Sequence, residues 1–136
     1  MKDKKLMVIG LLGAIAVALG ALGAHFLKGK LSTGLITTDQ LNGFDTAVKY
    51  QMYHVLAMLA LFLFSKYNSH KYIIWAYNSF IIGIVFFSGS LYFLCTRNLL
   101  GAEWLKALGP ITPIGGLFFI AGWIFIALTA LKKSKE

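Results

Sequence analysis

The chain has 136 residues, which is enough for a single domain. Apolar residues make up 58% of the sequence and charged residues 13%, whereas soluble domains carry about 25% charged residues. Too few polar side chains remain to cover a surface that faces water, so the composition excludes an ordinary soluble domain. The net charge of +8 does not indicate nucleic-acid binding, because lysines lie directly before the first apolar stretch and directly after the last, as in membrane proteins.

The first apolar stretch, residues 6–27, is long enough to cross a bilayer at about 1.5 Å per residue. It exceeds the apolar core of a signal peptide, which has about 7–15 residues, so we expect it to be retained. Its glycines and alanines form two helical stripes, which predict a central helix with close neighbours on two sides. The stripes are Gly10, Ala14, Ala18 and Ala21, and Gly13, Ala16, Gly20, Gly23 and Ala24.

The second apolar stretch begins with a recognisable helix start. Thr37 and Gln40 have the spacing of a capping box, so we expect a helix to begin near Thr38. The first turns of this helix are amphipathic and are expected to lie among lipid headgroups, whereas residues 55–64 are uniformly apolar.

Two further apolar stretches complete the prediction, separated by a loop at residues 97–109. Pro110 and Pro113 suit the first turn of the last helix, where a backbone N–H has no helical partner. The sequence therefore predicts one all-α transmembrane domain over residues 1–136, an integral membrane four-helix bundle. The expected spans are residues 6–27, 45–65, 72–94 and 110–131.

The basic residues predict the orientation of the bundle. With four spans, the two ends and the turn at residues 66–71 share one side of the membrane, and they carry eight of the 13 Lys and Arg residues. Because basic residues accumulate in cytoplasmic segments, both termini are expected in the cytoplasm.

Ionisable residues at membrane depth are functional candidates, and several lie between Asp45 and His54. Asp45 and Lys49 are four residues apart and can pair on one helix face, as can Tyr50 and His54. Asp45 is the acidic residue nearest the apolar core, so it is the candidate for coupling transport to protons. The alternative is a salt bridge between Asp45 and Lys49 at the interface.

Two histidines, His25 and His54, are expected at similar depth on neighbouring helices. Such a pair could ligate a haem or a metal ion, although zinc usually takes four ligands. The alternative, which we favour, is that both histidines hydrogen-bond the helices together. The single cysteine, Cys95, excludes an internal disulfide and fits a small apolar position near a helix end. With no trusted nucleophile–base spacing, the sequence indicates no enzyme, no catalytic or metal set and no identifiable cofactor.

Five distinctive strings follow one another along the chain: GALGAH at 20–25, YQMYH at 50–54, FSGSLY at 87–92, LGPITPIGG at 108–116 and Gly122-Trp123. Together they resemble a family of small bacterial four-span membrane proteins, catalogued as domain of unknown function number 423 and as an uncharacterised protein family. The resemblance covers nearly the whole chain. It implies four helices and a location in the bacterial plasma membrane, and it implies no activity.

These strings coincide with polar residues expected in the outer half of the membrane, where they could enclose a pocket between helices. We therefore expect a polytopic, non-enzymatic plasma-membrane protein that binds a small ligand or partner near the outer leaflet. Its expected partners are the lipid bilayer and further copies of itself, with no nucleic acid. The alternatives are a transporter or channel subunit acting as an oligomer, and a haem- or metal-binding redox protein. The candidate polar cluster comprises His25, Asp45, Lys49, Tyr50, Gln51, Tyr53, His54, Ser88, Ser90, Tyr92 and Thr112.

Overall fold

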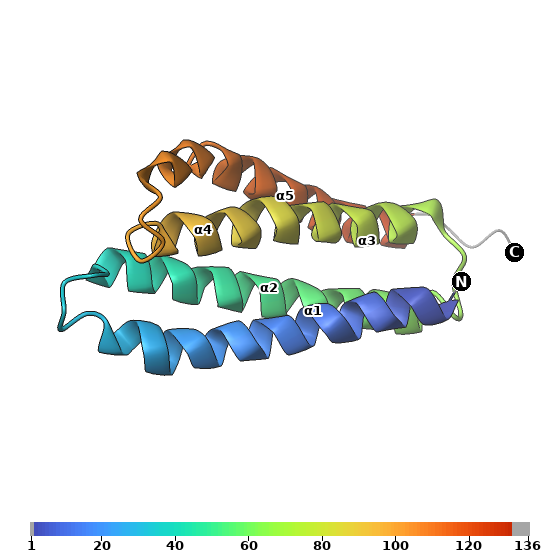
Figure 1. The fold of residues 1–136 in the computed structure, drawn as a ribbon. Helices are drawn as coiled ribbons and strands as arrows, with labels where there is room; N and C mark the ends of the chain where they lie inside the picture. Colours follow the sequence, from blue (N-terminus) through green and yellow to red (C-terminus); the bar gives the residue numbers. More distant parts are fainter. Residues whose placement is uncertain (1, 132–136) are drawn as a thin grey trace, which may run out of the picture.

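The protein folds into four long helical rods that lie side by side, in a computed structural model that describes residues 2–131 (Figure 1). The expected basic anchors Lys132, Lys133 and Lys135 lie outside the described residues. The first rod is α1 (Lys2–Leu22) followed by the π-helical segment η1 (Gly23–Leu27), and the second is α2 (Thr38–Phe64). The third joins α3 (Lys71–Gly83), the π-helical segment η2 (Ile84–Gly89) and α4 (Ser90–Thr96); the fourth joins the 3-10 helix η3 (Glu103–Leu108) to α5 (Ile111–Ala130).

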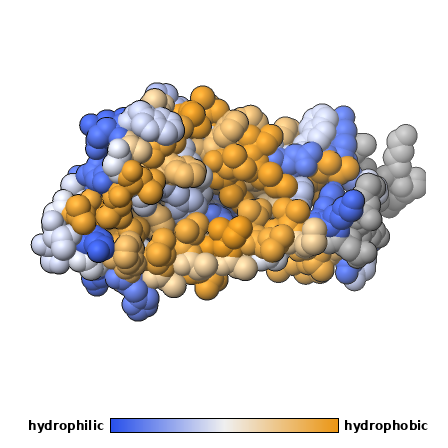
Figure 2. Space-filling view, in the orientation of Figure 1, coloured by the Kyte–Doolittle hydropathy of each residue, from blue (hydrophilic) through white to orange (hydrophobic). Residues whose placement is uncertain are grey.

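All four rods are long and apolar enough to cross a membrane. Each has 26 to 28 residues, with a mean hydropathy between 1.4 and 2.4 over its apolar window. At about 1.5 Å per residue they exceed the roughly 30 Å of a bilayer's hydrocarbon core. The surface agrees, since an apolar midsection separates two hydrophilic ends (Figure 2). The prediction of an all-α protein with four helices able to span a membrane is therefore confirmed.

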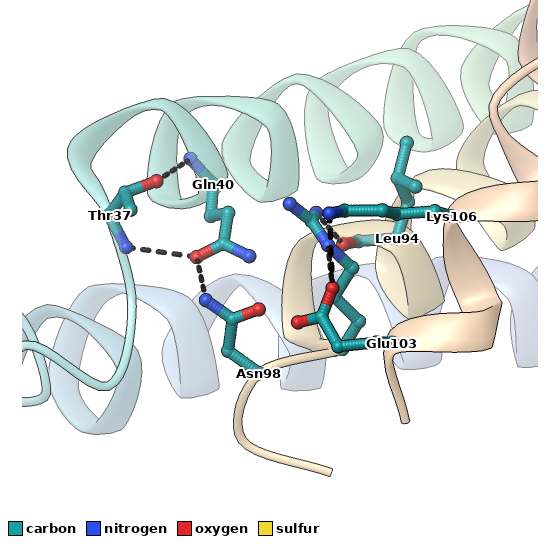
Figure 3. Close-up of polar contacts among 7 residues, drawn as sticks. Thr37, Gln40, Leu94, Asn98, Glu103 and Lys106 are labelled. Carbon is teal, nitrogen blue, oxygen red and sulfur yellow. Dashed lines mark hydrogen bonds and ion pairs between the residues drawn. The ribbon is translucent and has the colours of Figure 1, made fainter. Parts of the chain in front are cut away.

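The predicted start of the second helix is also confirmed. The Thr37 hydroxyl accepts a hydrogen bond from the backbone N–H of Gln40 at 3.2 Å, and the Gln40 side chain accepts one from the backbone N–H of Thr37 at 3.0 Å (Figure 3). This reciprocal pair satisfies two backbone donors that the first helical turn leaves free. The loop predicted at residues 97–109 is partly wrong, because Glu103–Leu108 forms a short 3-10 helix.

The four rods are buried to different extents. Only 17% of the apolar window is buried in the first and fourth rods, compared with 39% in the second and third. The prediction of a central first helix is therefore wrong, and α1 lies at the edge of the bundle beside α2 (Figure 1). One glycine stripe of α1 does pack closely, with Gly13, Gly20 and Gly23 against Val55, Val48 and Phe44 in that order. The other stripe, Gly10, Ala14, Ala18 and Ala21, is exposed.

The closest contact in the bundle brings α5 onto η2. A methyl group at Gly115 would collide with the backbone of Phe86 and Phe87, so the two main chains touch without an intervening side chain. Further along the same interface, Gly83 and Gly122 leave room for the rings of Phe119 and Phe80. Such small-residue contacts substitute for a hydrophobic driving force between helices, which is absent in lipid.

Gly115 and its neighbour Gly116 provide a matched test of this contact. Gly115→Ala is expected to lower the free energy of unfolding in detergent by about 1–3 kcal/mol, because the methyl group must push α5 away from η2. Gly116→Ala adds the same group where the nearest ring atom of Phe87 is 3.8 Å away, so its stability should stay unchanged or rise slightly. Denaturant unfolding followed by circular dichroism measures both, and an equal loss in both variants would contradict the contact.

Candidate functional site

A buried glutamine ties three rods together near the middle of the bundle. Gln51 on α2 is only 2% exposed. Its amide nitrogen donates to the backbone oxygen of Leu12 on α1 at 2.8 Å, and its amide oxygen accepts from the Tyr92 hydroxyl on α4 at 2.7 Å. Because lipid offers no alternative partners, such bonds hold helices in register.

Two serines make further bonds between rods. The Ser88 hydroxyl, fully buried in η2, donates to the backbone oxygen of Ala47 on α2 at 2.7 Å. The hydroxyls of Ser90 and Thr112 are 2.7 Å apart and join α4 to α5. These bonds join members of the candidate cluster to neighbouring rods, and Gln51, Ser90 and Tyr92 also line one groove of about 410 Å³.

His54 is buried between α2 and α5 and has a defined tautomer. The Trp123 indole N–H donates to its Nε2 at 3.2 Å, so Nε2 carries a lone pair. The proton must then sit on Nδ1, which lies 2.6 Å from the backbone oxygen of Tyr50 and donates to it. The imidazole also stacks on Phe119, with ring centroids 3.6 Å apart and planes inclined by 6°. Both nitrogens and one face of His54 are thus occupied.

A groove of about 660 Å³ opens beside His54, between α2 and α5. Exposed side chains on its rim, including Tyr53 and Leu117, place its opening on the lateral surface of the bundle, where a membrane would supply lipid. Its walls are mainly aromatic and aliphatic: Tyr50, Tyr53, His54, Phe87, Pro113, Gly116, Leu117, Phe119, Ile120 and Trp123.

The two histidines do not meet, so the hypothesis of a shared histidine site is wrong. The exposed His25 lies next to Gly23, which packs on Phe44, whereas Val55 beside His54 packs on Gly13. These contacts place the histidines about ten residues apart along the hairpin, or roughly 15 Å. Within residues 2–131, no group of three or more metal-ligating side chains gathers.

The charged members of the cluster lie on the surface. Lys49 and Asp45 form an ion pair at 2.6 Å with both side chains 57% exposed, so the salt-bridge alternative is confirmed. Tyr50 and Tyr53 are 41% and 56% exposed on the rim of the groove. Asp45, Lys49 and His25 are thus exposed and do not join the buried Gln51 in one enclosed cluster.

Sequence reasoning missed the α5 side of the groove. Phe119 stacks on His54 and Trp123 donates to it, yet neither was a candidate residue. A signal was present, because Trp123 belongs to one of the five strings that carry the resemblance. Its partner could not be named, since the meeting of side chains from α2 and α5 depends on the tertiary packing.

The fold and its lateral groove define a polytopic membrane protein with four helices able to span a bilayer. The sequence model of a family described as "Protein of unknown function (DUF423)" matches residues 19–116. The chain belongs to this family.

Relatives from distant bacteria agree with this assignment. A UPF0382 membrane protein of Staphylococcus epidermidis is 42% identical over 130 residues, covering 95% of this chain and 97% of the relative. One from Haemophilus influenzae is 39% identical and covers 98% of each chain. The UPF0382 membrane protein YwdK of Bacillus subtilis is 39% identical, covering 95% of this chain and 98% of the relative. No solved structure matches.

The bond between Gln51 and Tyr92 predicts a measurable coupling. Combining Gln51→Met with Tyr92→Phe should cost less than the sum of the two single changes, by about 0.6–2 kcal/mol, because each single change leaves the other partner unsatisfied. Unfolding in sodium dodecyl sulfate measures the four proteins of the cycle. Gln51→Met with Tyr53→Phe is the control and should be additive, since Tyr53 is exposed; a coupling of zero in the first cycle would contradict the bond.

Proposed function

We propose that this protein binds a small, lipid-soluble molecule in the groove between α2 and α5, without catalysing a reaction on it. The observation that carries the proposal is a groove of about 660 Å³ that opens laterally and contains one buried histidine among aromatic rings. Pockets of this size with few, well-placed polar groups are typical of ligand sites.

The walls favour a flat, aromatic ligand. Tyr50 and Phe87 stack with ring centroids 4.7 Å apart, and Phe119 is held between Phe87 and His54. Rings arranged in this way offer faces and edges to another ring.

The hydrogen bonds of His54 favour binding over catalysis. Its Nδ1–H is held by the backbone oxygen of Tyr50 and its Nε2 lone pair by Trp123. A histidine bonded at both nitrogens has no lone pair ready for a metal ion or a substrate proton. This arrangement supports a binding role more than the haem, metal or proton-coupled alternatives.

A single-tryptophan protein tests the groove directly. The chain has three tryptophans, so Trp75→Phe with Trp104→Phe leaves Trp123 as the only one. Titration with 1,4-naphthoquinone, a flat probe with two carbonyls, should quench Trp123 fluorescence to saturation. Adding Gly116→Leu fills the groove and should weaken binding about tenfold or more, because it occupies the space that the probe needs.

Ala127→Leu on the same helix is the matched control. Ala127 is exposed and does not line the groove, so this variant should bind the probe as its parent does. Quenching that rises without saturation and equally in all three proteins would show mere partitioning into the detergent, and it would refute the groove as a binding site.

We also propose that the protein lies in the plasma membrane with both termini in the cytoplasm. The start of α1, the turn between α2 and α3 and the end of α5 lie at one end of the bundle (Figure 1). Eight of the 13 basic residues belong to this end and its flanking tails, which supports a cytoplasmic side.

Cysteine labelling in spheroplasts tests this orientation. Ser32 and Ser69 are exposed in loops at opposite ends, and Cys95→Ala removes the native thiol. In that background, Ser32→Cys should react with a membrane-impermeant maleimide in intact spheroplasts, whereas Ser69→Cys should react only after permeabilisation. The reverse pattern would place the termini outside.

A further inference from the structure

A second polar site lies at the end of the bundle opposite the start of α1, where α2 begins and α4 ends. Gln40 in the first turn of α2 is 5% exposed. Its amide oxygen accepts hydrogen bonds from the backbone N–H of Thr37 at 3.0 Å and from the Asn98 amide at 3.3 Å. These two donors fix the amide, because a flip would turn its NH₂ group against them.

The amide nitrogen of Gln40 therefore points away from Thr37 and Asn98. It is buried, and no atom of residues 2–131 accepts from it. Figure 3 shows it turned away from Thr37, toward the side where Glu103 and Lys106 lie. A buried donor without an acceptor destabilises the fold, so this position calls for an acceptor from outside the described chain.

Positive charge converges on the same side. Arg97 at the end of α4 donates from Nη1 to the backbone oxygen of Leu94 at 2.6 Å. Its Nε is buried without a hydrogen bond to the described residues, and it lies 3.8 Å from the Glu103 carboxylate. Lys106 pairs with Glu103 at 3.2 Å. The Glu103 side chain is 62% exposed, so it can turn into solvent and release both cations.

From this geometry we propose that Gln40, Arg97 and Lys106 form a binding site for a phosphate group. Phosphate oxygens supply the acceptors that Gln40 Nε2 and Arg97 Nε lack, and a second oxygen can take the place of the Glu103 carboxylate. Guanidinium groups match phosphate geometry well. The nearby Trp104 is 74% exposed on η3, which suits a position at headgroup level, where lipid phosphates lie.

Native mass spectrometry of the full-length protein in neutral detergent tests this site. The probes are dioleoyl phosphatidylglycerol, dioleoylglycerol, which lacks only the phosphoglycerol headgroup, and inorganic phosphate. One phosphatidylglycerol should bind, and dioleoylglycerol should bind at least about tenfold more weakly. Displacement of the lipid by millimolar inorganic phosphate would assign the site to free phosphate, whereas retention would assign it to a headgroup; both outcomes support the proposal.

The variants change the site without removing the helix cap. Gln40→Glu keeps an acceptor for the N–H of Thr37 but replaces the buried donor by an anionic oxygen, so phosphatidylglycerol binding should fall about tenfold or more. Arg97→Gln should weaken binding similarly, and Glu103→Gln should strengthen it by removing the competing carboxylate. Lys28→Gln removes an exposed charge elsewhere and should bind as wild type.

Two results would overturn the site. One is equal binding of phosphatidylglycerol and dioleoylglycerol by the wild-type protein. The other is an unchanged affinity for phosphatidylglycerol in Arg97→Gln and Glu103→Gln. These two variants test the site even if Gln40→Glu fails to fold. In either case, water or another neutral acceptor would account for the buried donors.

Discussion

The direct contact between α5 and η2 is the constraint on which the rest of the structure depends. At Gly115 the two main chains touch, so no side chain separates α5 from the third rod at this point. The helical face that contains Gly115 also carries Thr112 one turn before it and Phe119 one turn after it. The Ser90–Thr112 bond and the stacking of Phe119 on His54 therefore both follow from this approach. A side chain at position 115 would move all of them together.

The bilayer explains how the polar groups are distributed along the rods. In hydrocarbon an unpaired polar group costs several kcal/mol, and water is absent as an alternative partner. Gln51, Ser88 and His54, in the middle of the bundle, accordingly all have partners on other rods or in their own backbone. Their bonds fix how the rods are aligned with one another. Apolar surfaces alone would let the rods slide past one another.

Sequence patterns were sufficient for features that depend on local chemistry. The length of the apolar stretches gives four rods, and the Thr37–Gln40 capping box gives the start of α2. They were insufficient for features that depend on the pairing of distant segments. The depth of His25 relative to His54 follows from the offset of the first hairpin, which Gly13 and Gly23 set through contacts with α2. Two small-residue stripes show that close approach is possible on either face of α1, but not which face is used. The π-helical turns have no signal in their local sequence that we can identify.

The buried side-chain donors that lack a hydrogen-bond partner lie where water or headgroups can reach the bundle. Within residues 2–131, the buried side-chain nitrogens without a hydrogen-bond partner belong to Gln40, Arg97 and His70. All three lie at ends of rods, and none lies among the paired groups of the middle. Since an orphaned donor costs less where water or headgroups can reach it, the ends can keep donors free for outside acceptors, whereas the middle cannot. The groove at mid-depth follows the same rule, because the imidazole of His54 is bonded at both nitrogens and the remaining walls are mainly aromatic and aliphatic. The middle therefore offers shape and aromatic contact, and the loop ends offer hydrogen bonds and charge. A molecule with an apolar ring suits the first, and a phosphate suits the second.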